Sequence, residues 1–194
     1  MNVQSEIADK KKAILKSTLR IIRNNGFQGT PISLIAKDAG VASGTIYHYF
    51  TCKDDIILDL YNTIRKEMLA AMFDDVSKES DFKSRFFEGW KNLCLYFITH
   101  PENLLFIEQY NCSPYYKISS KKKIKIPDNK FNEFFQYGMD NGFLKKMEYN
   151  LMASVVFGGI MTTAKYHVSG RFGYNEDDLC KIANIIWDGI KSGE

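Results

Sequence analysis

The sequence predicts an all-α protein, because proline is scarce and apolar residues recur at helical spacing. The 194-residue chain contains only four prolines, and proline breaks the interior of a helix. Proline-free stretches at 7–24, 54–77 and 151–169 are long enough for helices of several turns. The 45% hydrophobic and 25% charged residues are typical of a globular protein with a substantial core, not of a disordered or fibrous chain.

The first helix is expected over residues 6–25. Asn25 and Gly26 supply the residue types that end a helix. Lysines and arginines occupy much of the surface that faces away from the apolar stripe. That stripe recurs at helical spacing and consists of Ile14, Leu15, Thr18, Leu19 and Ile22.

A short second helix is expected over residues 31–39. Thr30 followed by Pro31 predicts an N-cap with proline at the first helical position. Gly40 is expected to end the helix. The inward positions, spaced i, i+3, i+4 and i+7, are Ile32, Ile35, Ala36 and Ala39.

A third short helix is expected over residues 44–50, after a four-residue turn. Successive residues of a helix are separated by 100°, so Ile46, Tyr49 and Phe50 form one inward stripe. Gly44 and His48 point outward, flanked by Thr45 and Tyr47. This outward face is small and polar and has no acid, which suits a helix lying in the major groove of DNA. The alternative is an ordinary solvated face, although such faces usually carry Lys and Glu.

Two short helices joined through a glycine turn, supported by a longer first helix, predict a helix-turn-helix unit. Residues 10–53 hold eight Lys or Arg against one acid, Asp38, a formal charge of +7. A basic first quarter on a nearly neutral body suggests a polyanion partner. A basic but merely solvated surface remains the alternative explanation of the charge.

The chain resembles the TetR family of bacterial regulators over roughly residues 10–60. Many positions agree at fixed spacing: Gly26-Phe27-x-x-Thr30-Pro31-Ile32-x-x-Ile35-Ala36-x-x-Ala39-Gly40-Val41-x-x-Gly44-Thr45-Ile46-Tyr47-His48-Tyr49-Phe50-x-x-Lys53. The resemblance implies an all-α fold of about nine helices, a C-terminal ligand-binding and dimerisation domain, and usually repression. One departure is Ala42-Ser43, where the family more often has Ser-Lys or Ser-Arg.

The resemblance and the surface chemistry together give the candidate DNA-binding residues. Lys53 matches a family position that contacts phosphate, and a solvated lysine is the alternative. Thr30 is expected to contact a phosphate, to cap the second helix, or both. Small residues at the start of the third helix would approach base edges. The full set is Thr30, Ser43, Gly44, Thr45, Tyr47, His48 and Lys53.

The middle of the chain is rich in aromatic residues, most of which amphipathic helices need for their core. Crowded rings in a helical domain can also surround an apolar cavity lined by a few polar groups. We therefore expect an unidentified small-molecule effector to bind there. The candidate lining residues are Trp90, Phe106, Gln109, Tyr110 and Phe134.

Two final helices, expected at 149–169 and 176–191, are candidates for a dimer interface. Asn175 is the expected N-cap of the second. Small residues in the first permit close helix approach, so two helices from each of two chains would form a four-helix interface. A purely intramolecular core is the alternative. The candidate interface residues are Val155, Gly159, Thr163, Leu179, Ile182, Ile186 and Ile190.

Other sites and compartments have little support in the sequence. The N-terminus lacks an apolar signal region, and the longest uncharged run, 149–164, is shorter than a membrane span. Four widely spaced cysteines are expected to be reduced, mostly buried thiols in a cytosol.

No metal-ligand spacing and no catalytic motif occur, so no metal, cofactor or enzymatic activity is expected. His100 and His167 are expected to be structural, and the lysine-rich segment 113–127 is expected to be a solvated loop.

The combined prediction is a cytoplasmic, homodimeric, DNA-binding transcriptional regulator that responds to a small molecule. Residues 1–53 would form the DNA-binding domain and residues 54–194 the helical ligand-binding and dimerisation domain. Repression, with release from a palindromic double-stranded operator, is favoured over activation, and no membrane partner is expected. Two rivals remain: a helical protein-interaction module that kept a helix-turn-helix without specific DNA binding, and an enzyme using the aromatic cavity.

Overall fold

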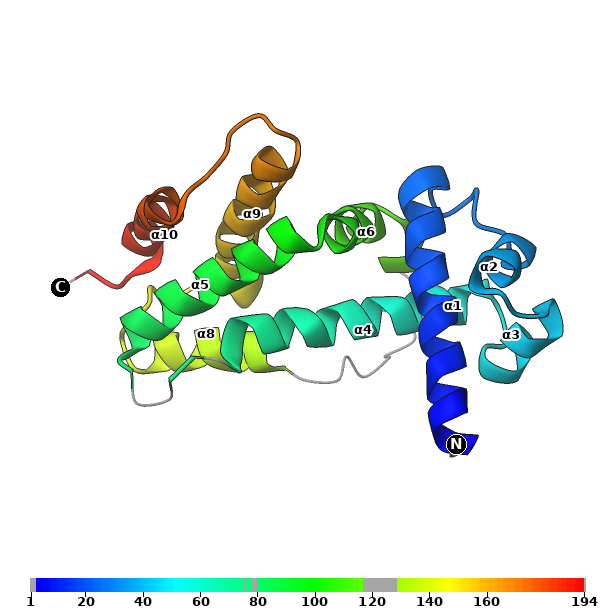
Figure 1. Cartoon of the computed structure of the whole chain (residues 1–194). Helices are drawn as coiled ribbons and strands as arrows, with labels where there is room; N and C mark the ends of the chain where they lie inside the picture. Colours follow the sequence, from blue (N-terminus) through cyan, green and yellow to red (C-terminus); the bar gives the residue numbers. More distant parts are fainter. Residues whose placement is uncertain (1–2, 75, 78–79, 117–128, 194) are drawn as a thin grey trace. The chain divides into compact units, whose positions relative to one another are not determined.

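The computed structural model describes residues 3–74, 76–77, 80–116 and 129–193, and the prediction of an all-α protein is confirmed (Figure 1). The chain divides into two compact units. The first comprises Met1–Ile64 with Leu105–Lys125, and the second comprises Arg65–Leu104 with Ile126–Glu194. Two helices, α4 (Lys53–Phe73) and α6 (Pro101–Asn111), contribute residues to both units. The predicted domain boundary after residue 53 stays a prediction.

Three helices build the start of the first unit: α1 (Val3–Asn25), α2 (Ile32–Ala39) and α3 (Ser43–Tyr49). Helix α2 packs against both α1 and α3 (Figure 1). The predicted apolar stripes meet in this core, where the fully buried side chains include Ile14, Ile22, Ile35 and Ile46. The periodicity of the sequence therefore predicted which faces of these short helices are buried.

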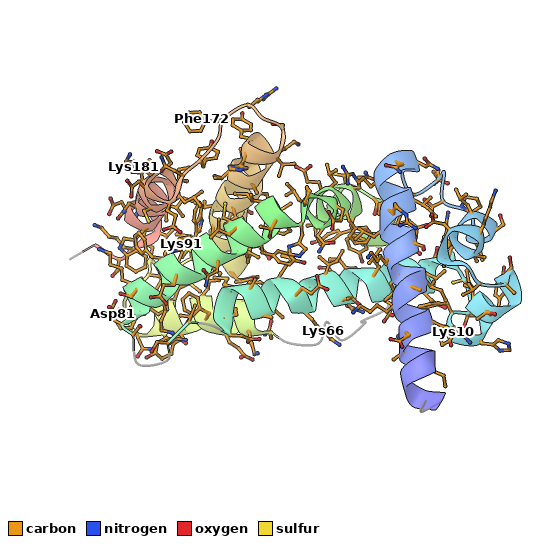
Figure 2. The ribbon with its side chains drawn as sticks, in the orientation of Figure 1. Lys10, Lys66, Asp81, Lys91, Phe172 and Lys181 are labelled. Atoms are coloured by element: carbon orange, nitrogen blue, oxygen red, sulfur yellow. The ribbon has the colours of Figure 1, made fainter. Side chains whose placement is uncertain are left out.

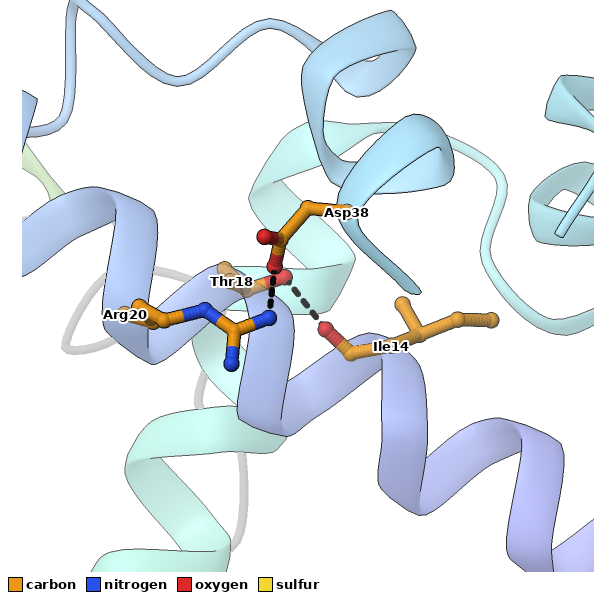
Figure 3. A network of polar contacts seen from close by, with 4 residues as sticks. All are labelled: Ile14, Thr18, Arg20 and Asp38. Carbon is orange, nitrogen blue, oxygen red and sulfur yellow. Dashed lines mark hydrogen bonds and ion pairs between the residues drawn. The ribbon is translucent and has the colours of Figure 1, made fainter. Parts of the chain in front are cut away.

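Polar contacts add to this packing (Figure 3). The hydroxyl of Thr18, which is buried, donates to the carbonyl of Ile14 at 2.8 Å within α1. The guanidinium of Arg20 donates to the carboxylate of Asp38 at 2.5 Å, joining α1 to α2. The hydrogen bond from Arg20 lowers the pKa of Asp38 below its usual value. The single acid of the basic N-terminal region is thus ionised at neutral pH and paired.

The N-cap predicted at Thr30 is wrong. Helix α2 begins at Ile32 with Pro31 as its N-cap, and no side chain caps it. The Thr30 hydroxyl instead donates to the carbonyl of Gly26 at 2.7 Å. Gly26 has φ +67°, a left-handed conformation that glycine adopts without strain. Thr30 therefore closes the turn between the first two helices rather than starting the second.

The second unit consists mainly of α5 (Phe82–Thr99), α8 (Lys130–Asp140), α9 (Tyr149–Val168) and α10 (Glu176–Ile190). Helix α5 packs against α9 and α10, and α9 also contacts α8 and α10. Rings from three of these helices fill the core, including Phe86, Trp90, Phe97, Phe131, Phe135 and Trp187. Most of the aromatic residues in the middle of the chain are core, as expected.

The predicted cap of α10 is confirmed. The side chain of Asn175 accepts from the backbone N–H of Asp178 at 2.9 Å, and the Asp178 carboxylate accepts from the Asn175 N–H at 3.3 Å. Such a reciprocal capping box satisfies two backbone donors at the start of a helix. Asp81 caps α5 in a simpler way, by accepting from the N–H of Ser84 (Figure 2).

The expectation of mostly buried cysteines is wrong. Only Cys94 is buried, and burial raises the pKa of its thiol to about 12. Cys52, Cys112 and Cys180 are exposed, because they lie in a turn, beyond the end of α6 and on the outer face of α10. All four cysteines are unpaired.

Among the described residues, no helix combines the length and apolar character needed to cross a membrane. Most of the lysine-rich segment expected to form a solvated loop, from residue 117 onward, lies outside the described residues.

Candidate nucleic-acid interface

Helix α3 has the two faces that the sequence predicts. Ile46 and Phe50 are buried and fix the helix to the first unit. On the opposite side Gly44 and His48 are exposed, and 57% of Tyr47 is accessible. Ser43 is also exposed, and Thr45 is half-buried. The predicted outward residues therefore form one accessible surface on one helix.

Gly44 leaves the start of α3 without a side chain on this surface. A Cβ atom built on Gly44 would meet no atom within 4 Å, so packing within the chain does not require glycine here. Its φ is not in the left-handed region, so the backbone does not require glycine either. What the missing side chain does provide is room for another molecule to approach the helix backbone closely.

Lys53, the first residue of α4, is held by the turn that follows α1. Its Nζ donates to the carbonyl of Phe27 at 3.0 Å, and the side chain is half-buried. The ring of Phe27 packs against Phe106 at 5.8 Å and against Tyr115 at 5.1 Å between centroids. Burial and the nearby Asp54 carboxylate raise the pKa of Tyr115, which keeps its hydroxyl neutral. The position of the Lys53 ammonium thus depends on an aromatic cluster that includes residues of α6 and the segment after it.

Thr30 does not belong to this exposed surface. Its relative exposure is 0%, and its hydroxyl is engaged with Gly26. The hydroxyl is therefore not accessible to a phosphate in this conformation, and its role here is to fix the turn before α2.

Two family models match the chain. Residues 14–60 match the model described as "Bacterial regulatory proteins, tetR family", and residues 81–191 match "Tetracyclin repressor-like, C-terminal domain". The chain belongs to the TetR family. It is accordingly a DNA-binding transcriptional regulator with a helix-turn-helix.

Relatives cover nearly the whole of this TetR-family chain. It is 27% identical to the fatty acid metabolism regulator protein of Bacillus subtilis over 95% of each chain. A TetR family transcription regulator from Marinobacter aquaeolei has the same fold, with a TM-score of 0.87, 22% identity, and coverage of 98% of this chain and 100% of the other. The regulator FadR of Bacillus subtilis, solved with stearoyl-CoA, has a TM-score of 0.64 at 22% identity, covering 91% and 95% of the two chains.

The five residues predicted to line an effector cavity are distributed over both units. Phe106, Gln109 and Tyr110 belong to the first unit, whereas Trp90 and Phe134 belong to the second. Gln109 lines a cavity of about 560 Å³ beside the turn after α1. Phe134 lines a different cavity, of about 520 Å³, in the second unit. Trp90, Phe106 and Tyr110 are buried and line neither of these two cavities. The five residues stay a prediction as a set.

The two final helices of this TetR-family chain face inward at most of the predicted interface positions. Thr163, Leu179, Ile186 and Ile190 are buried within their own chain. Gly159 is half-buried, and a Cβ there would meet Cδ1 of Ile186 at 2.4 Å, so the two helices pack through this glycine. These five residues therefore fit the alternative given above, in which the two helices form a purely intramolecular core. Val155 is exposed and Ile182 is half-buried.

Val155 is one predicted interface residue that is exposed, whereas two other exposed apolar side chains of these helices, Leu151 and Ile185, were not predicted. Ile185 is 72% accessible on α10, and Leu151 is 60% accessible on α9. Leu151, Val155, Gly158 and Thr162 follow one another at spacings of four, three and four, which is a helical stripe. That spacing was available in the sequence, but the adjacent inward stripe is equally apolar and concealed it.

Both remaining histidines make local contacts. The Nδ1 atom of His100 lies 3.0 Å from the carbonyl of Tyr96, and its ring stacks on that of Tyr96. His167 accepts the backbone N–H of Tyr174 at 3.2 Å through Nδ1. These contacts agree with the structural roles expected for both.

Replacing Tyr47 with Ala is expected to weaken operator binding without unfolding the protein. Tyr47 is exposed, so stability should change by no more than about 0.5 kcal/mol. Removing its interaction with a base or with the DNA backbone should cost about 1–3 kcal/mol of operator affinity. Tyr116→Ala removes another exposed tyrosine of the same unit and serves as the control. Fluorescence anisotropy with operator DNA and thermal melts would measure both effects; full affinity in the Tyr47 variant would exclude Tyr47 from the interface.

Replacing Lys53 with Ala is expected to lower affinity for every DNA sequence and to flatten the salt dependence. Removing one cation that neutralises a phosphate should reduce the slope of log K against log salt by about 0.9. Lys66→Ala, an exposed lysine farther along α4 (Figure 2), is the matched control. Because Lys53 also holds the Phe27 carbonyl, a lower melting temperature with an unchanged salt slope would show that Lys53 only supports the turn.

Proposed function

We propose that this TetR-family chain is a homodimeric repressor that a small fatty-acyl effector releases from a palindromic operator. The observation that carries the DNA-binding part is the exposed face of α3, which is small, hydrogen-bonding and free of acids. Carboxylates on that face would repel the phosphate backbone and the acceptor-rich edges of guanine. The protein would act in the cytoplasm, where the operator is accessible.

Two copies are needed to read a palindrome. Each copy would place α3 in the major groove, at half-sites about 34–36 Å apart, one helical turn of DNA. Ser43, Gly44 and Thr45 would approach the base edges, Tyr47 and His48 the bases or backbone, and Lys53 a phosphate. Base contacts give specificity, whereas phosphate contacts give affinity that falls with salt.

The exposed stripe on α9 and α10 is the surface we assign to the second copy. Its apolar members are the exposed Leu151, Val155 and Ile185 and the half-buried Ile182. Exposed apolar side chains gathered on neighbouring helices mark interaction surfaces in soluble proteins, and a twofold interface brings the same patch of each copy together. Gly158 and Thr162 lie on the same stripe and would let the helices of the two copies approach closely.

The effector class is inferred from the relatives and from the composition of the second unit. One relative is a fatty acid metabolism regulator, and one structural neighbour was solved with stearoyl-CoA. The second unit concentrates aromatic and aliphatic side chains between its helices, which suits a ligand with a long apolar part. Release requires the effector to bind the DNA-free state more tightly, with a coupling free energy of typically about 1–3 kcal/mol.

The test of DNA recognition is selection from a random-sequence pool with the purified protein, repeated at two salt concentrations. Enrichment of a palindrome with half-sites about one helical turn apart is expected. Failure of folded protein to enrich any sequence, at low and moderate salt, would instead favour the rival protein-interaction module.

The effector test uses the selected operator. Palmitoyl-CoA is expected to release the protein–operator complex at micromolar concentration, whereas coenzyme A alone should not. A complex that resists palmitoyl-CoA, palmitate and stearoyl-CoA would exclude the fatty-acyl class while leaving the DNA-binding function intact.

Replacing Ile185 with Asp is expected to convert the dimer to a monomer, because a carboxylate would be buried without a partner in the interface. Operator affinity should fall with it, since each copy would bind a half-site alone. Gln136→Asp introduces the same charge at an exposed position of α8 and should stay dimeric. Sedimentation velocity and operator binding would measure both outcomes; an unchanged dimer would move the interface elsewhere.

A further inference from the structure

The second unit contains a cavity whose lining combines aromatic rings with a cation. It has a volume of about 520 Å³ and is bounded by the end of α4, the start of α5 and α8. Figure 2 marks the start of α5 by Asp81. The lining residues on which the following steps depend are Phe73, Arg85, Lys130, Glu133, Phe134 and Tyr137.

The apolar side of the cavity is a rigid aromatic wall. The ring of Phe134 stacks on Phe82 at 4.7 Å, with 15° between the planes, and lies 5.5 Å from Phe73. Phe134 is buried by these neighbours, whereas Tyr137 is half exposed at the rim. Packed rings of this kind offer a preformed surface to an apolar chain. Binding therefore costs little free energy for ordering the site.

Arg85 supplies the polar side of the cavity. Its guanidinium carbon lies 5.5 Å above the centroid of the Phe134 ring. Within residues 3–74, 76–77, 80–116 and 129–193, its side chain makes no hydrogen bond or ion pair, although it is half-buried. A guanidinium stacked on a ring keeps its N–H donors along its edge, where they match the oxygens of a carboxylate, phosphate or sulfonate.

The nearby acids do not occupy those donors. Asp74 and Glu133 line the same cavity, but both are exposed and neither forms an ion pair with Arg85. Lys130, also exposed, adds a second cation. The charged groups therefore lie at the rim, and the half-buried guanidinium beside the rings is the group placed to bind an anion.

We propose that this cavity binds an anionic amphiphile, with Arg85 holding the anionic group and Phe73, Phe134 and Tyr137 contacting the apolar part. This deepens, and rests on, the fatty-acyl effector proposed above, because it assigns the anion to one residue. Fatty acids and acyl-CoA esters both belong to this class, the first through a carboxylate and the second through phosphates.

Binding is tested first without DNA, using the fluorescent anionic amphiphile 1-anilinonaphthalene-8-sulfonate and the full-length protein. Arg85→Gln should raise the Kd by roughly tenfold or more, because hydrogen bonds to charged groups are among the stronger ones. Arg85→Lys, which keeps the charge but not the planar fork, should fall in between. Competition by palmitate, palmitoyl-CoA and coenzyme A then shows which anion the site prefers.

Lys83→Gln is the matched control. Lys83 lies on the same helix, two residues away, and its ammonium also lies over a ring, 5.7 Å from the centroid of Phe87, but it does not line the cavity. This variant should bind the probe as the unmodified protein does. Equal Kd values for the Arg85→Gln, Lys83→Gln and unmodified proteins would overturn the proposal, and circular dichroism checks that each variant is folded.

Operator release separates this inference from the proposed function. If palmitoyl-CoA releases the unmodified protein and the Arg85→Gln variant at the same concentration, the effector binds elsewhere and the Arg85 site is wrong, while the function stands. If no fatty-acyl compound releases the unmodified protein from the operator but Arg85→Gln still raises the Kd for the probe, the Arg85 site stands and the proposed effector class fails.

Discussion

The exposed face of α3 depends on the burial of a few isoleucines that hold α1, α2 and α3 together. Ile14 and Ile22 of α1, Ile35 of α2 and Ile46 of α3 are fully buried, and each such side chain contributes roughly 1.5–3 kcal/mol. Helix α3 has only seven residues, too few to be stable by itself in water. Because Ile46 fixes its inner side, the exposed residues on the outer side are not needed to hold the helix in place.

Polar contacts then set the positions of the parts around this core. The hydrogen bond from Arg20 to Asp38 joins α1 to α2, and the one from Thr30 to the Gly26 carbonyl closes the turn between them. Lys53 reaches back to the Phe27 carbonyl, so the start of α4 and the turn after α1 are held together. Since the Phe27 ring also packs on Phe106 of α6, a shift of α6 would disturb the surroundings of Lys53.

Under the proposed function, the second unit has to be stable and still receive a ligand. Its centre is closed by buried rings, whereas the cavity at Arg85 lies where three helix ends leave a stacked wall uncovered. Placing the charge at the edge of the core avoids the large cost of burying an unpaired guanidinium. The outer stripe of α9 and α10 remains exposed, so the proposed ligand site and the proposed dimer interface would use different faces.

The sequence by itself determined the helix-turn-helix and the outward face of α3. Those features depend on local rules: helical periodicity, glycine at helix ends and the absence of acids over seven residues. Only the tertiary structure decided that Thr30 is buried, that Ile185 rather than Ile186 faces outward, and that Arg85 lies over Phe134. In α10 both neighbouring isoleucines are apolar, so only the packing of Ile186 against Gly159 selects the inner one. Contacts between residues far apart in the chain leave no periodic pattern, and for that reason the proposed effector cavity and the proposed dimer face follow only from the fold.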